Sequence, residues 1–270
     1  MPTLLFHVNA FTRVPFRGNP AAVVILDEPH EEAWMQSVAR EMNLSETAFV
    51  MPIGDNEFAL RWFTPLTEVP LCGHATLAAA HVLLREGVVT GEMTFATRSG
   101  LLHVAPSGEA LAMTFPRFET EPAESPQIVK ALGVNAVETR LARDAAKLVV
   151  RVATEQEVLD VAPDLEALLN ANDIDVRGVI VTASTPPNNA GPAPHFVSRY
   201  FAPWVGIAED PVTGSAHSVL GPFWSERLGR KRFLAAQRST RGGDLGVEVR
   251  DDAVLITGSC VSISRGMLSI

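Results

Sequence analysis

Cysteine is scarce in this chain: its 270 residues include only Cys72 and Cys260. A disulfide-stapled scaffold is therefore not expected, and a reducing compartment is the simpler interpretation. Long apolar runs are also missing, since no window approaches the ~20 consecutive apolar residues of a membrane span. The first residues lack the basic start and the apolar stretch of a signal peptide. We therefore expect a cytoplasmic protein with no membrane partner.

Clusters of basic residues are missing as well. The formal net charge is -9, and no Lys/Arg run forms the basic face that a nucleic-acid-binding protein usually shows. We therefore expect no nucleic-acid partner. A small anionic substrate is still compatible with this charge, because local dipoles and single arginines can hold one. Hydrophobic residues make up 47% of the chain, which is enough to build the core of one large domain or of two small ones.

The strongest pattern in the sequence is an internal repeat. Residues 68–75 read Glu-Val-Pro-Leu-Cys-Gly-His-Ala, and residues 209–216 read Glu-Asp-Pro-Val-Thr-Gly-Ser-Ala. Upstream, Arg-Trp-Phe-Thr-Pro at 61–65 matches Arg-Tyr-Phe-Ala-Pro at 199–203. Close helix packing alone would explain Gly-x-Ala, but not the matched Glu-x-Pro and Arg-aromatic-Phe. Two copies at half-chain spacing predict two similar lobes, whereas a solenoid needs three or more shorter repeats.

Each copy of the repeat is predicted to lead from a strand, through a glycine, into a helix. The first backbone N–H groups of a helix lack intrahelical partners and carry the positive end of the dipole. Gly73 and Gly214 would let a ligand approach the backbone there, so each helix start is a candidate carboxylate site. Two starts facing one cleft could also stabilise the negative charge of an enol-like transition state.

Three segments resemble a known family in their order and spacing. They are Asn-Ala-Phe at 9–11 with Gly-Asn-Pro at 18–20, Leu-Cys-Gly-His-Ala-Thr at 71–76, and Glu-Asp-Pro-Val-Thr-Gly-Ser-Ala-His at 209–217. Over nearly the whole chain, the sequence is similar to the phenazine-biosynthesis isomerase family. The resemblance implies the α+β fold of diaminopimelate epimerase: two pseudo-symmetric lobes, each a curved, mostly antiparallel sheet around a central helix. It also implies an active site between the lobes, no cofactor and a homodimer; no metal is expected.

The resemblance also implies which residues form the site. The family's acid/base glutamate lies in an Asn-Leu-Ser-Glu-Thr segment, which stands here at 43–47, so Glu46 is the implied proton shuttle. Without the resemblance, the sequence favours a solvated residue at a helix-to-strand corner for Glu46. In the phenazine enzyme, the reaction moves a proton within a cyclic dihydro-hydroxyanthranilate. The implied catalytic residues are Glu46, His74 and Asp210, and the implied substrate contacts are Asn19, Ser45, Gly73, Gly214 and Ser215.

Cys72 keeps a second enzymatic interpretation open. Diaminopimelate epimerases and proline racemases use two opposed cysteines, one in each repeat, and Cys72 occupies the first of these positions. No cysteine aligns in the second repeat, where residues 211–213 stand, so a two-thiol racemase is not predicted. A Cys72-dependent epimerase or dehydratase of a cyclic amino acid stays open, because a helix start lowers the pKa of a thiol. A structural role for Cys72 as a small buried residue is nevertheless the favoured interpretation. A non-catalytic binding protein that kept the fold is a further alternative.

The predicted domain boundaries follow from the repeat and from a Pro- and Glu-containing stretch. They place an N-terminal lobe at 1–117, a linker at 118–125 and a C-terminal lobe at 126–261. The last strand, at about 262–270, is a candidate to complete the first lobe. A long loop at 184–194, rich in Pro and Asn, is expected to shape the choice of substrate. The sequence does not identify that substrate.

Overall fold

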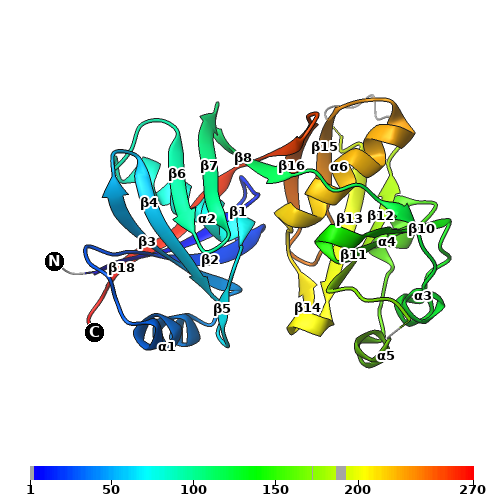
Figure 1. Cartoon of the computed structure of the whole chain (residues 1–270), viewed down its shortest axis with the longest axis horizontal. Helices are drawn as coiled ribbons and strands as arrows, with labels where there is room; N and C mark the ends of the chain where they lie inside the picture. The colour runs from blue at the N-terminus through cyan, green and yellow to red at the C-terminus, as the bar shows by residue number, and fades with distance from the viewer. Residues whose placement is uncertain (1–2, 172, 187–192) are drawn as a thin grey trace. The chain divides into compact units, whose positions relative to one another are not determined.

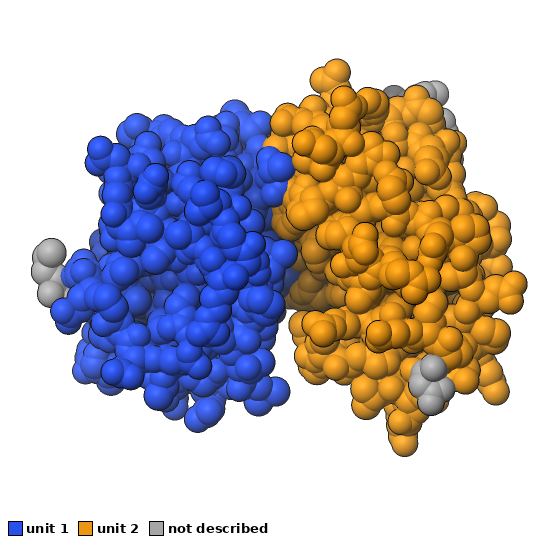
Figure 2. Space-filling view, viewed as in Figure 1, with its two compact units in different colours: residues 1–114, 257–270 blue, residues 115–256 orange. Residues whose placement is uncertain are grey.

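The computed structural model describes residues 3–171, 173–186 and 193–270. The chain divides into two compact units, which Figure 2 colours separately: residues 1–114 with 257–270 form unit 1, and residues 115–256 form unit 2. Both units combine strands with helices, which confirms the predicted α+β class. No helix in the described part of the chain is long and apolar enough to cross a membrane.

Unit 1 is built on a mostly antiparallel sheet (Figure 1). Its parallel pairs are β2 with β3 and β4 with β6. The C-terminal strand, β18, pairs with β1. The strands are β1 (Thr3–Ala10), β2 (Asn19–Ile25), β3 (Glu46–Gly54), β4 (Glu57–Phe63), β5 (Glu68–Val69), β6 (Met93–Thr97), β7 (Gly100–Ser107), β8 (Ala110–Pro116) and β18 (Cys260–Leu268).

Two helices belong to unit 1, α1 (Glu32–Met42) and α2 (Gly73–Arg85). Helix α2 packs against β1, β2, β3 and β18, and its Ala- and Leu-rich sequence is buried along nearly its whole length. The helix ends at a glycine stop. Gly87 has a φ of 71° and donates to Leu84 O at 3.2 Å, while Val88 donates to Leu83 O at 2.9 Å. These two bonds cap the last carbonyls, and glycine adopts the required left-handed backbone without strain.

The strands of unit 2 also pair mostly antiparallel. The parallel pairs are β11 with β12 and β13 with β15. The strands are β9 (Glu121–Pro122), β10 (Glu138–Ala142), β11 (Lys147–Arg151), β12 (Gly178–Ser184), β13 (Phe196–Ala202), β14 (Ile207–Asp210), β15 (Arg232–Gln237), β16 (Gly243–Val249) and β17 (Ala253–Gly258). The helices are α3 (Pro126–Leu132), α4 (Glu155–Leu159), α5 (Leu165–Asn170) and α6 (Gly214–Leu228).

The internal repeat is reproduced strand by strand. In unit 1, β3 pairs in parallel with β2 and antiparallel with β4; β4 pairs antiparallel with β5 and, after α2, in parallel with β6. In unit 2, β12 pairs in the same senses with β11 and β13; β13 pairs antiparallel with β14 and, after α6, in parallel with β15. The prediction of two pseudo-symmetric lobes is therefore confirmed.

The repeated arginine and glutamate form equivalent ion pairs in the two units. Arg61 of β4 binds both carboxylate oxygens of Glu68 in β5, at 2.7 Å each. Arg199 of β13 binds Glu209 of β14 in the same way, at 2.7 and 3.0 Å. Each guanidinium also lies over the ring of the phenylalanine two residues further on. Each pair fixes the short strand that leads into a helix start, which explains why Glu-x-Pro and Arg-aromatic-Phe occur together.

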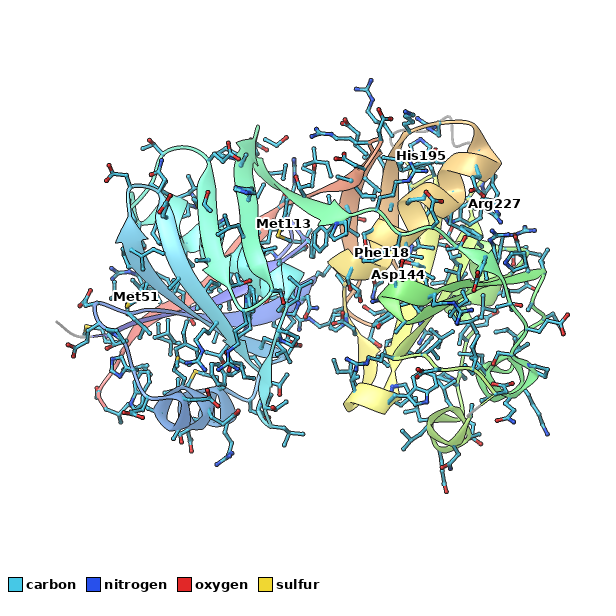
Figure 3. The ribbon with its side chains drawn as sticks, in the orientation of Figure 1. Met51, Met113, Phe118, Asp144, His195 and Arg227 are labelled. Atoms are coloured by element: carbon cyan, nitrogen blue, oxygen red, sulfur yellow. The ribbon has the colours of Figure 1, made fainter. Side chains whose placement is uncertain are left out.

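The stretch 118–125, which composition predicted as a linker, lies within unit 2. Its strand β9 pairs with β10, and the side chain of Arg140 donates to the carbonyl of Thr120. Proline is compatible with such an edge strand, because one side of the strand needs no ladder donors. Arg227 at the end of α6, labelled in Figure 3, binds Glu138 of the same strand β10 at 3.0 Å.

Candidate active site

Three of the residues implied by the resemblance meet in unit 1. Helix α1 ends at Asn43, whose left-handed backbone turns the chain into β3. Glu46 opens β3, and Asn19 opens the neighbouring parallel strand β2. His74, the second residue of α2, lies against both: its Nδ1 is 3.1 Å from Asn19 Nδ2, and its Nε2 is 3.1 Å from Glu46 Oε2. The structure thus brings together an amide, an imidazole and a carboxylate.

Glu46 and His74 form a buried pair that can still bind another polar group. Only 7% of Glu46 and 5% of His74 are exposed. The facing atoms pair with each other at 3.1 Å, and neither has a further hydrogen-bond partner in the described ranges. A buried polar atom without a partner costs free energy. The pair is therefore arranged to receive a polar group from a ligand or from water.

The pKa of His74 is raised, although the dipole at the start of α2 by itself would lower it. Burial lowers the pKa of His74, but the charges of an ionised Cys72 and of Glu46 outweigh it, so that the pKa lies well above 6.5. Because Cys72 is a neutral thiol at neutral pH, the Glu46 carboxylate is the charge that favours the imidazolium there. The Asn19 amide nitrogen donates a hydrogen bond to His74 Nδ1. If Nδ1 became protonated, the amide would have to turn so that its oxygen accepts from the ring instead.

Cys72 lies at the start of α2 and is not an activated thiol. Its Sγ is 3.5 Å from His74 Nδ1, and only 7% of the residue is exposed. Burial raises the pKa of Cys72 to about 11, and the charge of Glu46 acts in the same direction. These effects oppose the lowering expected from a helix start. The structure thus weakens the interpretation of Cys72 as a base at neutral pH.

The two helix starts share a further property. Cys72 is the N-cap residue of α2 and Thr213 that of α6, and neither side chain caps its helix. The first amides are thus not occupied by a capping side chain and suit an anionic group. Gly73 and Gly214 open the two helices as predicted. The roles of these amides and of the half-buried Ser45 as substrate contacts stay predictions.

Unit 2 carries the remaining implied residues. Asp210 ends β14, and its carboxylate accepts the Thr213 hydroxyl, which explains why that hydroxyl does not cap α6. Ser215 is half-buried at the position equivalent to His74. Gly214 packs closely against Phe115, because a Cβ there would lie 2.9 Å from the ring and the ring would have to shift. That the two helix starts serve one substrate stays a prediction.

Sequence reasoning missed Gln237, which holds the turn between Asp210 and α6. The side chain is fully buried at the end of β15. Its Nε2 donates to the Asp210 carbonyl at 2.7 Å, and its Oε1 accepts the Thr213 N–H at 2.9 Å. Gln237 thus positions both residues from a strand 24 or more positions away. No local signal could have found it, because β15 itself was not predicted.

A buried histidine supports the start of α6. His217 is fully buried, and its Nδ1–H donates to the Thr213 carbonyl at 2.8 Å. The ring stacks on Phe196 with the centroids 6.0 Å apart. Burial lowers the pKa of His217 to about 4, against the opposing effect of the Thr213 carbonyl. The ring is therefore neutral in the folded protein at neutral pH.

His217 should make the folded protein sensitive to acid. The unfolded chain binds a proton near the ordinary pKa of 6.5, whereas the folded chain binds it only near 4. The stabilisation is thus complete above about pH 6.5 and is lost as the pH falls toward 4. When the pH is lowered from roughly 7.5 to 5, we expect the contribution of His217 to the free energy of unfolding to fall by about 2 kcal/mol. Urea unfolding of wild type and His217→Gln at both pH values tests this: an unchanged pH dependence in the variant contradicts the assignment.

Comparison with known proteins connects this geometry to a family. The family model of phenazine biosynthesis-like proteins matches residues 8–266. An uncharacterized isomerase of Halalkalibacterium halodurans is 42% identical over 272 residues, which cover 99% of each chain. The crystal structure of a PhzF-family phenazine biosynthesis protein of Enterococcus faecalis has a TM-score of 0.91 at 41% identity, covering 100% of both chains. A probable proline racemase of Agrobacterium radiobacter, with a TM-score of 0.65 at 13% identity and coverage of 99% and 93%, shares the fold alone. The predicted epimerase-like fold is confirmed.

Proposed function

The chain belongs to the family of phenazine biosynthesis-like proteins, and from this premise we propose that it is a cofactor-independent isomerase of a small, carboxylate-bearing, cyclic metabolite. The reaction is a proton shift within the substrate. The observation that carries the proposal is the buried Glu46–His74 pair, whose facing atoms are 3.1 Å apart and lack further hydrogen-bond partners in the described part of the chain. The relative from Halalkalibacterium halodurans is itself described as an isomerase.

Glu46 is the group that moves the proton in this proposal. Its carboxylate takes a proton from a ring carbon and returns it to another carbon on the same face of the substrate. A single residue that takes and returns a proton suits a shift on one face. His74 is close enough to orient the carboxylate and to hold a substrate oxygen, while Asn19 fixes the other edge of the ring. The shift leaves the composition of the substrate unchanged.

The helix starts supply the electrostatic part of the proposal. Negative charge develops on the substrate when the proton leaves, and uncapped helix amides stabilise such charge without reorganising. Gly73 would present amides from α2, and Gly214 with Ser215 would present amides from α6. Asp210 would hold a substrate amine, in a position fixed by Thr213 and Gln237. A carboxylate-bearing substrate fits these donors.

Product analysis on a defined panel tests the proposal. The panel consists of the cyclic dihydro-hydroxyanthranilate, proline, hydroxyproline and aromatic amino acids. We expect an isomer, with unchanged mass and altered NMR spectrum, from the cyclic diene or from a close analogue. Loss of water from the substrate would support a dehydratase instead. Binding by calorimetry without any new product across the panel would support a non-catalytic protein.

Replacing Cys72 separates the proposed isomerase from a thiol-dependent enzyme. We expect Cys72→Ala to retain kcat within about tenfold, because a neutral buried thiol contributes little general-base catalysis at neutral pH. The measurement is the initial rate of isomer formation at saturating substrate. Cys260→Ser is the matched control, since Cys260 lies half-buried in β18. Complete loss of turnover in Cys72→Ala alone would favour the thiol-dependent enzyme.

A further inference from the structure

Glu46, Cys72 and His74 bring three different donor atoms to one buried place. A carboxylate oxygen, a thiol sulfur and an imidazole nitrogen all lie within 4.8 Å of one another. All three residues are buried. Zinc bonds to such atoms are about 2.0–2.3 Å long, so one small cation between them could contact all three after small side-chain rotations.

The donor set selects the kind of cation. Magnesium and calcium prefer oxygen ligands throughout, whereas a thiolate and an imidazole suit zinc and other thiophilic metals. Three protein ligands and one open position are also the arrangement of catalytic zinc sites, in which water or substrate takes the fourth position. We propose that Glu46, Cys72 and His74 form a binding site for a single Zn²⁺ or a similarly thiophilic dication, and that the bound ion blocks the proton shift.

Two of the donor atoms, Glu46 Oε2 and His74 Nε2, face each other at 3.1 Å as an ion pair and have no further polar partner in the described ranges. A cation would satisfy both at once, which offsets the cost of burying them. On binding, the S–H bond of Cys72 and the Nε2–H bond of His74 break, metal–sulfur and metal–nitrogen bonds form, and both protons leave to solvent. No oxidation or reduction occurs.

Inhibition follows from the identity of the ligands. A metal ion bound to Glu46 occupies the lone pair that would accept the substrate proton, and it holds His74 away from the substrate. This consequence rests on the proposed function, whereas metal binding itself does not. Mg²⁺ should leave turnover unchanged, because the thiol and imidazole give it no advantage over water.

Cobalt(II) is the spectroscopic probe of the site. Titrating tag-free protein with Co²⁺ should produce a thiolate-to-cobalt charge-transfer band in the near ultraviolet that saturates at one ion per chain. Zn²⁺ should then displace the cobalt and abolish the band. The band should persist in Cys260→Ser and disappear in Cys72→Ser, whose Zn²⁺ affinity by calorimetry should fall at least about tenfold. Cys72→Ala with the same circular dichroism spectrum serves as a second variant.

The outcomes separate the metal site from the proposed reaction. A wild-type protein without the band, or a band that survives in Cys72→Ser and Cys72→Ala, overturns the site. If the band forms as expected but Zn²⁺ leaves an active isomerase uninhibited, the ion does not block the proton shift and the second half of the proposal is wrong. If the band forms and no panel compound is converted, the metal site stands and the proposed function fails.

Discussion

Replacing Glu46 with glutamine should lower kcat by about a thousandfold, because the amide cannot take a proton from a ring carbon at neutral pH. Glutamine has nearly the same shape, so β3 and the packing around His74 should be retained. Substrate binding should change much less than turnover, since the helix starts and not Glu46 carry the proposed carboxylate contacts. Initial rates across a range of substrate concentrations separate kcat from KM.

Two controls make this result specific. Glu41→Gln, on the exposed face of α1, removes a carboxylate without touching the site and should leave kcat unchanged. Thermal unfolding of Glu46→Gln should show a folded protein with a cooperative transition. A folded Glu46→Gln variant that turns over at the wild-type rate would remove Glu46 from the mechanism.

Glu209→Gln should lower the free energy of unfolding by about 3 to 5 kcal/mol, because it leaves a largely buried arginine without its counter-charge. Arg199 has 12% of its side chain exposed and binds both oxygens of Glu209. The neutral amide presents an N–H group toward the guanidinium in place of an acceptor. Since Glu209 precedes Asp210 in β14, the turn into α6 should loosen as well. Urea denaturation with linear extrapolation measures the change.

An ion pair with an exposed carboxylate provides the matched comparison. Arg227 and Glu226 are 3.4 Å apart, with 57% of the Glu226 side chain exposed. Glu226→Gln should therefore change the free energy of unfolding by less than about 1 kcal/mol. Equal effects of the two substitutions would mean that the repeated Arg–Glu pair does not stabilise the strand before α6. A double-mutant cycle with Arg199→Met would give the coupling energy directly.

The parts of the fold that follow from local patterns were predictable from the sequence. The buried helix α2 and its glycine stop could be identified because an Ala- and Leu-rich run ended at Gly87. The repeat predicted two lobes because each copy carries its own strand, turn and helix start. β10 and β15 were missed, since Glu-Thr-Arg-Leu-Ala and Arg-Phe-Leu-Ala-Ala-Gln are poor in the β-branched and aromatic residues that mark strands. Their pairing with distant strands decides their conformation.

The candidate site, too, was predictable only in part from the sequence. Glu46, His74 and Asp210 were named by a family resemblance, which states residue types and order but no contacts. That Glu46 and His74 face each other follows only from the parallel pairing of β2 with β3 and the packing of α2 against them. The raised pKa of His74 was not predictable either, because the helix dipole points the other way and the outcome depends on the nearby carboxylate. Gln237 required the tertiary structure.

Labelling the migrating hydrogen tests the central claim most directly. The substrate, prepared with deuterium on the ring carbon that loses the proton, is incubated with wild type, Glu46→Gln and Cys72→Ala, and the label at that carbon is followed by NMR. We predict that wild type and Cys72→Ala remove the label from that carbon as the isomer forms, while folded Glu46→Gln leaves it in place. Removal of the label by Glu46→Gln at the wild-type rate, together with its retention by Cys72→Ala, would contradict the account.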